Sequence, residues 1–310
     1  MKLLFLLNPY QGYNFKKDTT HLLMLEAKRR GHSVYYGTPE GLLLEGASPY
    51  SLVQPVHPLE AAPYFRFIGP KKKKSLSDFD QIWMRQDPPW DLNYYIATLI
   101  LSQVRSKTLI INAPRALRDW NEKIAILSFP NFIAPTIVSS SLPTLIEFWH
   151  SQKEGVILKP LNSFGGQGVS RLKPFSQVSQ RIATATLKKM TAGSVPIMAQ
   201  KFLKEVHEGE KRVFLWHGKI LGALKKIPPP RQYLTSPDLG GSLARTGLTA
   251  REKKLSLAVS RRLTSEGILF AGLDLIGGFL TEINVTSPGL LWELNELYGE
   301  SFEKKIWDSF

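Results

Sequence analysis

Two apolar stretches near the C-terminal end, within residues 267–288, carry polar residues at regular intervals and constrain the fold more than any other part of the chain. A Gly-Gly pair between them favours a tight hairpin turn, because glycine accepts positive φ without steric cost. Side chains alternate across a strand, so Glu282 and Asn284 face the same side. Asp274 lies on the partner strand, where the hairpin can bring it close to that pair. Two carboxylates and an amide oxygen on one sheet face predict a site for Mg²⁺, which prefers oxygen ligands.

The same alternation also occurs in hairpins that simply expose one polar face to water. The residues of the hairpin alone do not decide between a metal site and a solvated face. The choice between these interpretations depends on whether the rest of the chain supplies the other parts of a site.

The chain has 310 residues, which is enough for two or three domains with substantial cores. No apolar run reaches the length that spans a bilayer, and the short run at residues 3–7 is typical of a first strand and too short for a signal peptide. Cysteine is absent, so disulfides, zinc–thiolate sites and a cysteine nucleophile are excluded. These features are compatible with a reducing cytoplasm, and we expect a cytoplasmic protein with no membrane partner.

The chain is strongly basic, with 40 Lys and Arg against 26 Asp and Glu and a formal net charge of +14. Such an excess could attract nucleic acid, an anionic membrane or phosphorylated ligands. The densest run, four lysines at 71–74, is typical of a solvated loop. There is no zinc-finger spacing and no aromatic-basic RNA-binding motif, so we expect no specific nucleic-acid partner. Any binding to nucleic acid should be weak and should be lost as the salt concentration rises.

Strand and helix patterns alternate through the N-terminal part, which predicts an α/β region with an open parallel sheet. Residues of about 50–80 are polar, proline-bearing and basic, so they are expected to form a long excursion. A domain boundary is expected near residue 120. The expected elements are a strand over 2–7, a helix from Asp18 or Thr19 to about Arg30, strands over 32–37 and 81–85, a helix near 92–105 and a strand over 108–112.

A strand over 156–160 places Lys159 shortly before a glycine-rich stretch that contains Gly165, Gly166 and Gly168. In such a loop, backbone N–H groups can approach phosphates closely, and the nearby lysine adds positive charge. No Gly-Lys-Ser/Thr sequence opens a helix here, so this is not a Walker loop. Because glycine turns with a nearby lysine are common, the stretch alone does not establish a nucleotide site.

Several short stretches, taken in order along the chain, resemble bacterial glutathione synthetases, which belong to the ATP-grasp carboxylate–amine ligases. The resemblance extends from the first strand to about residue 288 and is interrupted mainly at 230–247. Several matches in one order are far more specific than any one of them. They lie at 15–19, 25–32, 84–89 and 117–123, and at Asp274 followed by Glu-Ile-Asn-Val-Thr-Ser-Pro at 282–288.

The resemblance implies an α/β protein that becomes α+β in its ATP-grasp part. Residues 1–120 would form an N-terminal open parallel-sheet domain that precedes the ATP-grasp part. Residues 121–202 would form a central lobe with a glycine-rich lid, and residues 203–310 a C-terminal lobe with the magnesium hairpin. ATP would lie between these two lobes, because a grasp requires two lobes that can close.

The resemblance also implies the activity and the residues that carry it. An ATP-dependent ligase would join the carboxylate of a dipeptide, γ-glutamylcysteine, to the amino acid glycine through an acyl phosphate, with release of ADP. Mg²⁺ or Mn²⁺ would be the metal, and a homo-oligomer, either a dimer or a tetramer, is expected. The residues implied for catalysis are Lys159 and Arg212, and those implied for nucleotide contacts are these two together with Lys123, Gly165, Gly166, Gly168, Gln200 and Phe202. Phe202 also fits a core position. The implied metal ligands are Asp274, Glu282 and Asn284, and the implied substrate contacts are Arg85, Asp87, Lys226, Ser287 and Gly289.

The chain departs from the family pattern around the expected acceptor pocket. Leu234 and Ser236 stand where the family has arginine and asparagine, and Lys226 replaces an arginine. Residues 289–292 are more apolar than expected around a polar tripeptide product. One alternative therefore stays open, a sister ligase with another carboxylate or amine. The net charge of +14 leaves a second alternative open, a nucleotide- or nucleic-acid-binding relative without ligase activity. The complete metal set of the hairpin favours an active enzyme.

Overall fold

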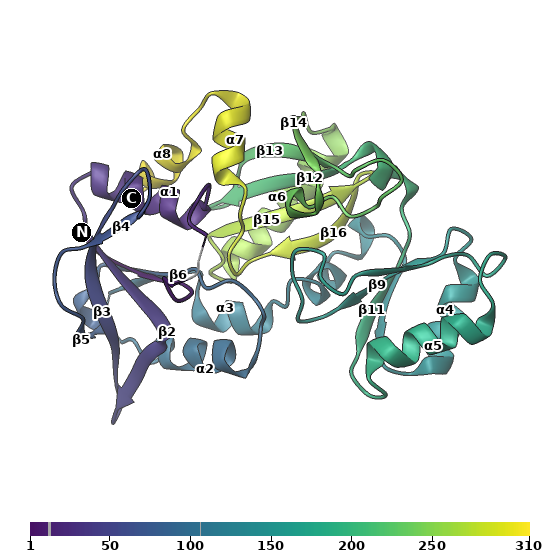
Figure 1. Ribbon diagram of the computed structural model, residues 1–310, viewed down its shortest axis with the longest axis horizontal. Helices are drawn as coiled ribbons and strands as arrows, with labels where there is room; N and C mark the ends of the chain where they lie inside the picture. Colours follow the sequence, from purple (N-terminus) through teal and green to yellow (C-terminus); the bar gives the residue numbers. More distant parts are fainter. Residues whose placement is uncertain (12–13, 106) are drawn as a thin grey trace.

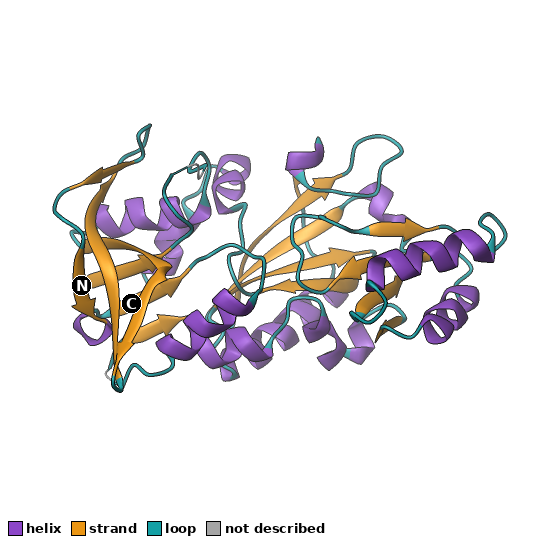
Figure 2. Ribbon diagram, turned by 60° about the horizontal axis from the view of Figure 1, so that its bottom comes forward, coloured by secondary structure: helices purple, strands orange, loops and turns teal. Residues whose placement is uncertain are grey.

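The computed structural model describes residues 1–11, 14–105 and 107–310 and shows an elongated molecule built on three sheets (Figure 1). The N-terminal sheet lies at one end, a small sheet with two helices lies at the other end, and the C-terminal sheet lies between them (Figures 1 and 2). No helix within these residues is both long and apolar enough to cross a membrane. The mixture of a partly parallel sheet with antiparallel sheets confirms the predicted fold class.

The centre of the N-terminal sheet is parallel, as predicted. Strand β1 (Lys2–Leu6) pairs with β2 (Ser33–Glu45) on one side and with β6 (Gln81–Met84) on the other, and β6 pairs with β7 (Leu109–Ile111). The helix between the first two strands, α1 (Thr19–Arg29), begins where Asp18 accepts a hydrogen bond from the backbone N–H of His21 at 2.7 Å. This cap stabilises the first turn, because it satisfies a backbone donor that the helix leaves unpaired. The helix after β6, α2 (Leu92–Leu101), ends earlier than the predicted 105.

The predicted excursion at about 50–80 instead extends the same sheet with antiparallel strands. Strand β3 (Ser48–Pro58) pairs with β2, and both β4 (Phe65–Phe67) and β5 (Lys72–Ser75) pair with β3. The prediction of a loop for the lysines at 71–74 is therefore wrong, because most of them lie in an edge strand. Lysines suit an exposed edge, since their charge opposes pairing with the edge of another chain.

The small sheet is antiparallel and has a core of its own. Its strands are β8 (Thr136–Ser139), β9 (Val156–Pro160), β10 (Ser170–Leu172) and β11 (Ile197–Lys201), in the spatial order β10-β9-β11-β8. Helices α4 (Leu142–Ser151) and α5 (Gln180–Thr191) run along this sheet (Figure 1). The buried members of its core are Leu145, Trp149, Val156, Leu158, Leu172, Ala183, Leu187, Ile197 and Ala199.

The C-terminal sheet is antiparallel and is packed against the N-terminal part. Helix α6 (Ala250–Ser265) packs on two of its strands, β12 (Glu210–Trp216) and β13 (Lys219–Ile227). The short helix α3 (Pro114–Asp119) follows β7 in the N-terminal part. Trp83 of β6 stacks on Trp216 with ring centroids 6.0 Å apart and an interplanar angle of 5°. The strands, in spatial order, are β14 (Ser242–Arg245), β13 (Lys219–Ile227), β12 (Glu210–Trp216), β15 (Phe270–Ile276) and β16 (Phe279–Asn284).

The two C-terminal helices return to the N-terminal part. Helices α7 (Leu291–Tyr298) and α8 (Phe302–Trp307) lie beside α1 (Figure 1). The indole N–H of Trp307 donates to the backbone carbonyl of Leu23 at 3.1 Å, and both side chains are buried in one core. The N- and C-terminal parts therefore share a core, to which the small sheet adds Met198, while most apolar residues of the small sheet form the separate core described above. The division at residues 120 and 202 stays a prediction.

Candidate active site

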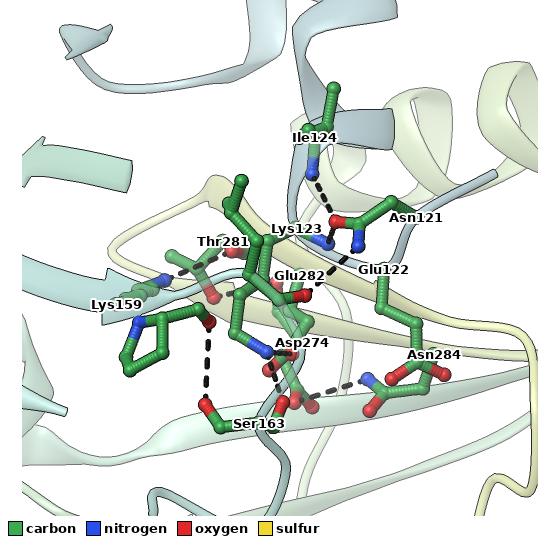
Figure 3. A network of polar contacts seen from close by, with 12 residues as sticks. Asn121, Glu122, Lys123, Ile124, Lys159, Ser163, Asp274, Thr281, Glu282 and Asn284 are labelled. Atoms are coloured by element: carbon green, nitrogen blue, oxygen red, sulfur yellow. Dashed lines mark hydrogen bonds and ion pairs between the residues drawn. The ribbon is translucent and has the colours of Figure 1, made fainter. Parts of the chain in front are cut away.

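Strands β15 and β16 form the predicted hairpin, and its turn at Gly277 and Gly278 has φ angles of +56° and +78°. The register pairs Asp274 directly with Glu282, and Asn284 follows two residues later on the same strand. Asn284 Nδ2 donates to Asp274 Oδ2 at 3.3 Å (Figure 3). The structure thus brings together the three residues that the sequence suggests as metal ligands.

Asp274 is buried and is held by two cations, one on the adjacent strand β12 and one on the next strand, β13. Arg212 Nε donates to Asp274 Oδ1 at 2.7 Å and Arg212 Nη2 to Oδ2 at 2.9 Å, which is a bidentate pair. Lys226 Nζ lies 3.1 Å from Asp274 Oδ1. Burial alone would raise the pKa of Asp274, but the charges of Arg212 and Lys226 hold the pKa well below its ordinary range. Asp274 is therefore an ionised counter-ion within the site.

Glu210 belongs to the same network, although the sequence analysis did not single it out. Its Oε2 atom lies 2.7 Å from Lys226 Nζ, and it also accepts a hydrogen bond from the hydroxyl of Thr235. Glu210 and Arg212 are two residues apart on β12, so they face the same side of the sheet. The alternation of Glu210 and Arg212 could have been recognised in the sequence. Only the pairing of Arg212 on β12 with Asp274 on β15 shows that this face of β12 lies beside Asp274.

Glu282 is paired with a different cation from a distant part of the chain. Lys123 Nζ lies 3.1 Å from Glu282 Oε1 and donates to the carbonyl of Ser163 (Figure 3). The neighbouring Glu122 accepts three hydrogen bonds on Oε1, from the backbone N–H groups of Val285 and Thr286 and from the Thr286 hydroxyl. Burial, together with the nearby charge of Glu282, raises the pKa of Glu122. Glu122 is a second residue that the sequence analysis missed.

Lys159 and Gln200 extend from the small sheet toward the hairpin. Lys159 Nζ lies 3.1 Å from Gln200 Oε1 and 3.1 Å from the carbonyl oxygen of Thr281. Gln200 Nε2 in turn donates to Thr136 Oγ1 at 2.9 Å. Burial lowers the pKa of Lys159. The contact of Lys159 with Thr281 joins the small sheet to the C-terminal sheet at the site.

A cavity of about 440 Å³ lies where these groups meet. All residues that the sequence analysis proposed for the site line this cavity, with the exceptions of Arg85 and Gly168. Arg85 is 3% exposed and donates to Thr20 Oγ1 and to the carbonyl of Pro288. A Cβ atom on Gly168 would lie 2.9 Å from Pro160 Cγ, so this glycine allows the loop to approach its own strand. Because Arg85 and Gly168 do not line the cavity, the structure does not bring either residue into contact with the space that a ligand would fill.

Phe202 is both a core residue and part of the cavity wall. Its side chain is 2% exposed, and the guanidinium of Arg171 lies 3.5 Å from its ring centroid. Leu234 and Ser236, which depart from the family pattern, also line the cavity. The Cδ2 atom of Leu234 lies 3.6 Å from the point that a Cβ on Gly166 would occupy. The segment that carries Leu234 therefore packs directly against the glycine-rich loop.

The arrangement of two antiparallel sheets around a charged cavity is that of an ATP-grasp fold. A D-cycloserine synthetase structure matches with a TM-score of 0.70 and 14% identity, covering 99% of each chain. An ATP-grasp protein with a RimK domain from Sphaerobacter thermophilus matches with a TM-score of 0.61 and 15% identity, covering 99% of this chain and 98% of the other. At these identities the comparison defines the fold alone, which is the ATP-grasp fold.

The chain belongs to the prokaryotic glutathione synthetase family. The pattern of the N-terminal domain of that family matches residues 1–118, and that of its ATP-grasp domain matches residues 122–299. Glutathione synthetases from Bradyrhizobium diazoefficiens and Parasynechococcus marenigrum are 35% and 38% identical, over 98% and 97% of this chain and 95% of each relative. Members of this family are ADP-forming, ATP-dependent ligases, and this chain is such an enzyme.

Proposed function

We propose that this enzyme is a glutathione synthetase that joins γ-glutamylcysteine to glycine and converts ATP to ADP and phosphate. The observation that carries the proposal is the buried group of Arg212, Lys226 and Asp274 beside the Lys123–Glu282 ion pair in one cavity, in a chain that matches its family over nearly its whole length. Buried cations beside carboxylates suit a site where phosphate and carboxylate groups react together.

The nucleotide is proposed to lie between the small sheet and the hairpin. Lys159 and the backbone N–H groups near Gly165 and Gly166 would face its phosphates, because glycine lets the backbone approach an anion closely. Gln200 and Phe202 also line the cavity and would contact the base. Leu234 packs against Gly166 and would help to keep water away from the phosphates when the nucleotide is bound.

The donor set of the hairpin fits a divalent cation such as Mg²⁺, and Mn²⁺ is a second candidate. No three His, Cys, Asp or Glu side chains gather as a metal cluster within the described ranges, and the proposed set has two carboxylates and one amide. Glu282 and Asn284 line the cavity, and Asn284 uses its Nδ2 atom on Asp274, which leaves the amide oxygen for a metal. Asp274 would share its oxygens with Arg212. A bound cation would neutralise charge on the phosphates.

The reaction proceeds in two displacements. An oxygen of the cysteinyl carboxylate bonds to the γ-phosphorus of ATP, the bond from that phosphorus to the bridging oxygen breaks, and ADP leaves. The amine of glycine then attacks the carbonyl carbon of the acyl phosphate and loses a proton, and phosphate leaves as the amide forms. Arg212 and Lys226 offset charge on the reacting oxygens, and no side-chain nucleophile is needed.

The charge of Lys159 predicts a pH dependence of ATP affinity. Burial lowers the pKa of Lys159 below its ordinary value of 10.5, so the ammonium loses its proton at a lower pH than an exposed lysine does. ATP affinity should therefore fall with rising pH in the wild type and stay nearly constant in Lys159→Arg, since arginine keeps its charge. Calorimetric titration from about pH 7 to about pH 10 measures this. Equal pH slopes for the two proteins would show that Lys159 does not contact the phosphates.

The substrate assignment is tested by ADP release from purified enzyme. ATP, γ-glutamylcysteine and glycine should give brisk turnover. Omission of either γ-glutamylcysteine or glycine should abolish it. Leu234 and Ser236 line the cavity and favour one rival, a sister ligase with a less polar substrate. That rival is supported if γ-glutamylcysteine gives no ADP while another dipeptide or amino acid turns over. A cytoplasmic location and a dimeric or tetrameric state stay predictions.

A further inference from the structure

One edge of the N-terminal sheet carries the four lysines at 71–74. Strand β5 pairs with β3 alone among the described strands, and Lys73 lies directly opposite Leu52, so these two side chains share one face of the sheet. Residues 71–73 are exposed, and no residue from 41 to 75 lines the cavity. The N-terminal sheet also lies at the opposite end of the molecule from the small sheet (Figure 1). A partner could therefore lie along this edge without covering the cavity.

This edge is strongly basic. Residues 41–75 contain five Lys and Arg against two Glu. Glu45 is paired with Lys73 at 2.6 Å, and the two side chains are 51% and 45% exposed. In the part of the chain that the structure describes, Lys71 and Lys72 form no ion pair. Because an exposed ion pair contributes little in water, these lysines keep most of their attraction for an external anion.

Aliphatic side chains are exposed beside the lysines. Ile68 is 58% exposed, and its N–H donates to the carbonyl of Pro55 on β3 at 3.0 Å, so it precedes the lysines along the same edge. Leu52, opposite Lys73, is 38% exposed, and Leu44 in the β2–β3 hairpin is 44% exposed. Lysines next to exposed aliphatic groups suit the surface of an anionic membrane, where the charges meet the headgroups and the aliphatic groups reach the acyl boundary.

The tyrosines of this region favour a membrane over a nucleic acid as the partner. Single-stranded nucleic acids bind proteins by stacking their bases on open aromatic rings. The ammonium of Lys73 lies 5.1 Å from the ring centroid of Tyr50, and that of Lys74 lies 5.6 Å from the ring centroid of Tyr35. Each lysine therefore covers one face of a ring. The edge offers charge together with aliphatic groups, and not charge together with open rings.

We propose that this edge binds the surface of an anionic membrane, with Lys71, Lys72 and Lys73 against the lipid phosphates and with Ile68 and Leu52 at the acyl boundary. The sequence predicted no membrane partner because no apolar run could span a bilayer, but a surface that lies on the headgroups needs no such run. The proposal is independent of the substrate assignment, since the residues of this edge do not line the cavity.

Co-sedimentation of the full chain with vesicles tests the proposal at about 0.15 M ionic strength. Wild type should bind vesicles of equal parts phosphatidylcholine and phosphatidylglycerol and should not bind vesicles of phosphatidylcholine alone. The triple variant Lys71→Gln, Lys72→Gln, Lys73→Gln should bind about a hundredfold more weakly, because each lysine near an anionic surface contributes roughly a factor of five. Ile68→Gln should weaken binding several-fold, and this loss should persist as the salt concentration rises.

The matched control is the triple variant Lys153→Gln, Lys188→Gln, Lys189→Gln. It removes the same charge from exposed positions around the small sheet, at the other end of the molecule (Figure 1). Its affinity for the anionic vesicles should stay within about twofold of wild type, because charges far from the membrane are screened by salt. Thermal unfolding should be unchanged in both triple variants, since the replaced side chains are exposed.

Hydrogen exchange locates the contact, and single-stranded RNA of mixed sequence is the rival ligand. Anionic vesicles should slow the exchange of amides at 68–75 and leave the small sheet unchanged. Equal weakening by the two triple variants would show that net charge alone drives binding and would overturn the proposal. Protection outside 68–75 alone, tighter binding to RNA than to the anionic vesicles, or no binding of wild type to either would also overturn it.

Discussion

Replacing Glu282 by glutamine is expected to lower ADP formation at least about a hundredfold while the protein stays folded, because the change removes charge stabilisation from the reacting centre. The Glu282 side chain is 23% exposed and forms an ion pair with Lys123. The amide has nearly the same shape as the carboxylate, so the backbone of the hairpin should not move. Asn284→Ala is expected to act in the same direction.

The measurement is the rate of ADP release at saturating ATP, with thermal unfolding followed in parallel. Glu300→Gln is the matched control, because it makes the same chemical change at an exposed pair with Lys305. Turnover like that of the wild type in Glu282→Gln would show that Glu282 serves only as the partner of Lys123.

Asp274→Asn is expected to destabilise the protein by about 3–5 kcal/mol, the usual effect of removing one partner from a buried charge pair. Arg212 is 8% exposed and Lys226 is 6% exposed, so neither cation can recover its lost partner by turning to water. Because the pKa of Asp274 is depressed, its contribution to stability is present above the ordinary value of 3.8 and is lost as the pH falls below it.

Urea unfolding of Asp274→Asn and wild type measures the difference. The control is Glu45→Gln, which breaks the exposed pair with Lys73 and should change the free energy of unfolding much less. If the two variants unfold at the same urea concentration, the Arg212–Asp274 pair does not contribute to stability as its burial implies.

Local signals in the sequence located the hairpin correctly. The paired glycines, the alternation of Glu282 and Asn284 and the cap at Asp18 each depend on residues within a few positions of one another. Such features follow from backbone sterics and side-chain alternation, so a single sequence is enough to predict them.

Pairings between distant strands were beyond the reach of the sequence. Asp274 was proposed as a metal ligand, but its buried pairing with Arg212 and Lys226 depends on the order of strands in the C-terminal sheet. Arg85 was proposed as a substrate contact, but its guanidinium points to Pro288, more than two hundred positions along the chain. The antiparallel extension of the N-terminal sheet was missed because its strands contain the proline and lysine residues typical of loops.

The most direct test of the account uses γ-glutamylcysteine labelled with ¹⁸O in both oxygens of its cysteinyl carboxylate. The attack of this carboxylate on ATP makes one labelled oxygen the bridge of an acyl phosphate, and that oxygen leaves with phosphate when glycine attacks. Mass spectrometry should therefore find one ¹⁸O atom in the phosphate for each glutathione formed, with ADP as the other product. Unlabelled phosphate, or AMP in place of ADP, would contradict the proposed mechanism.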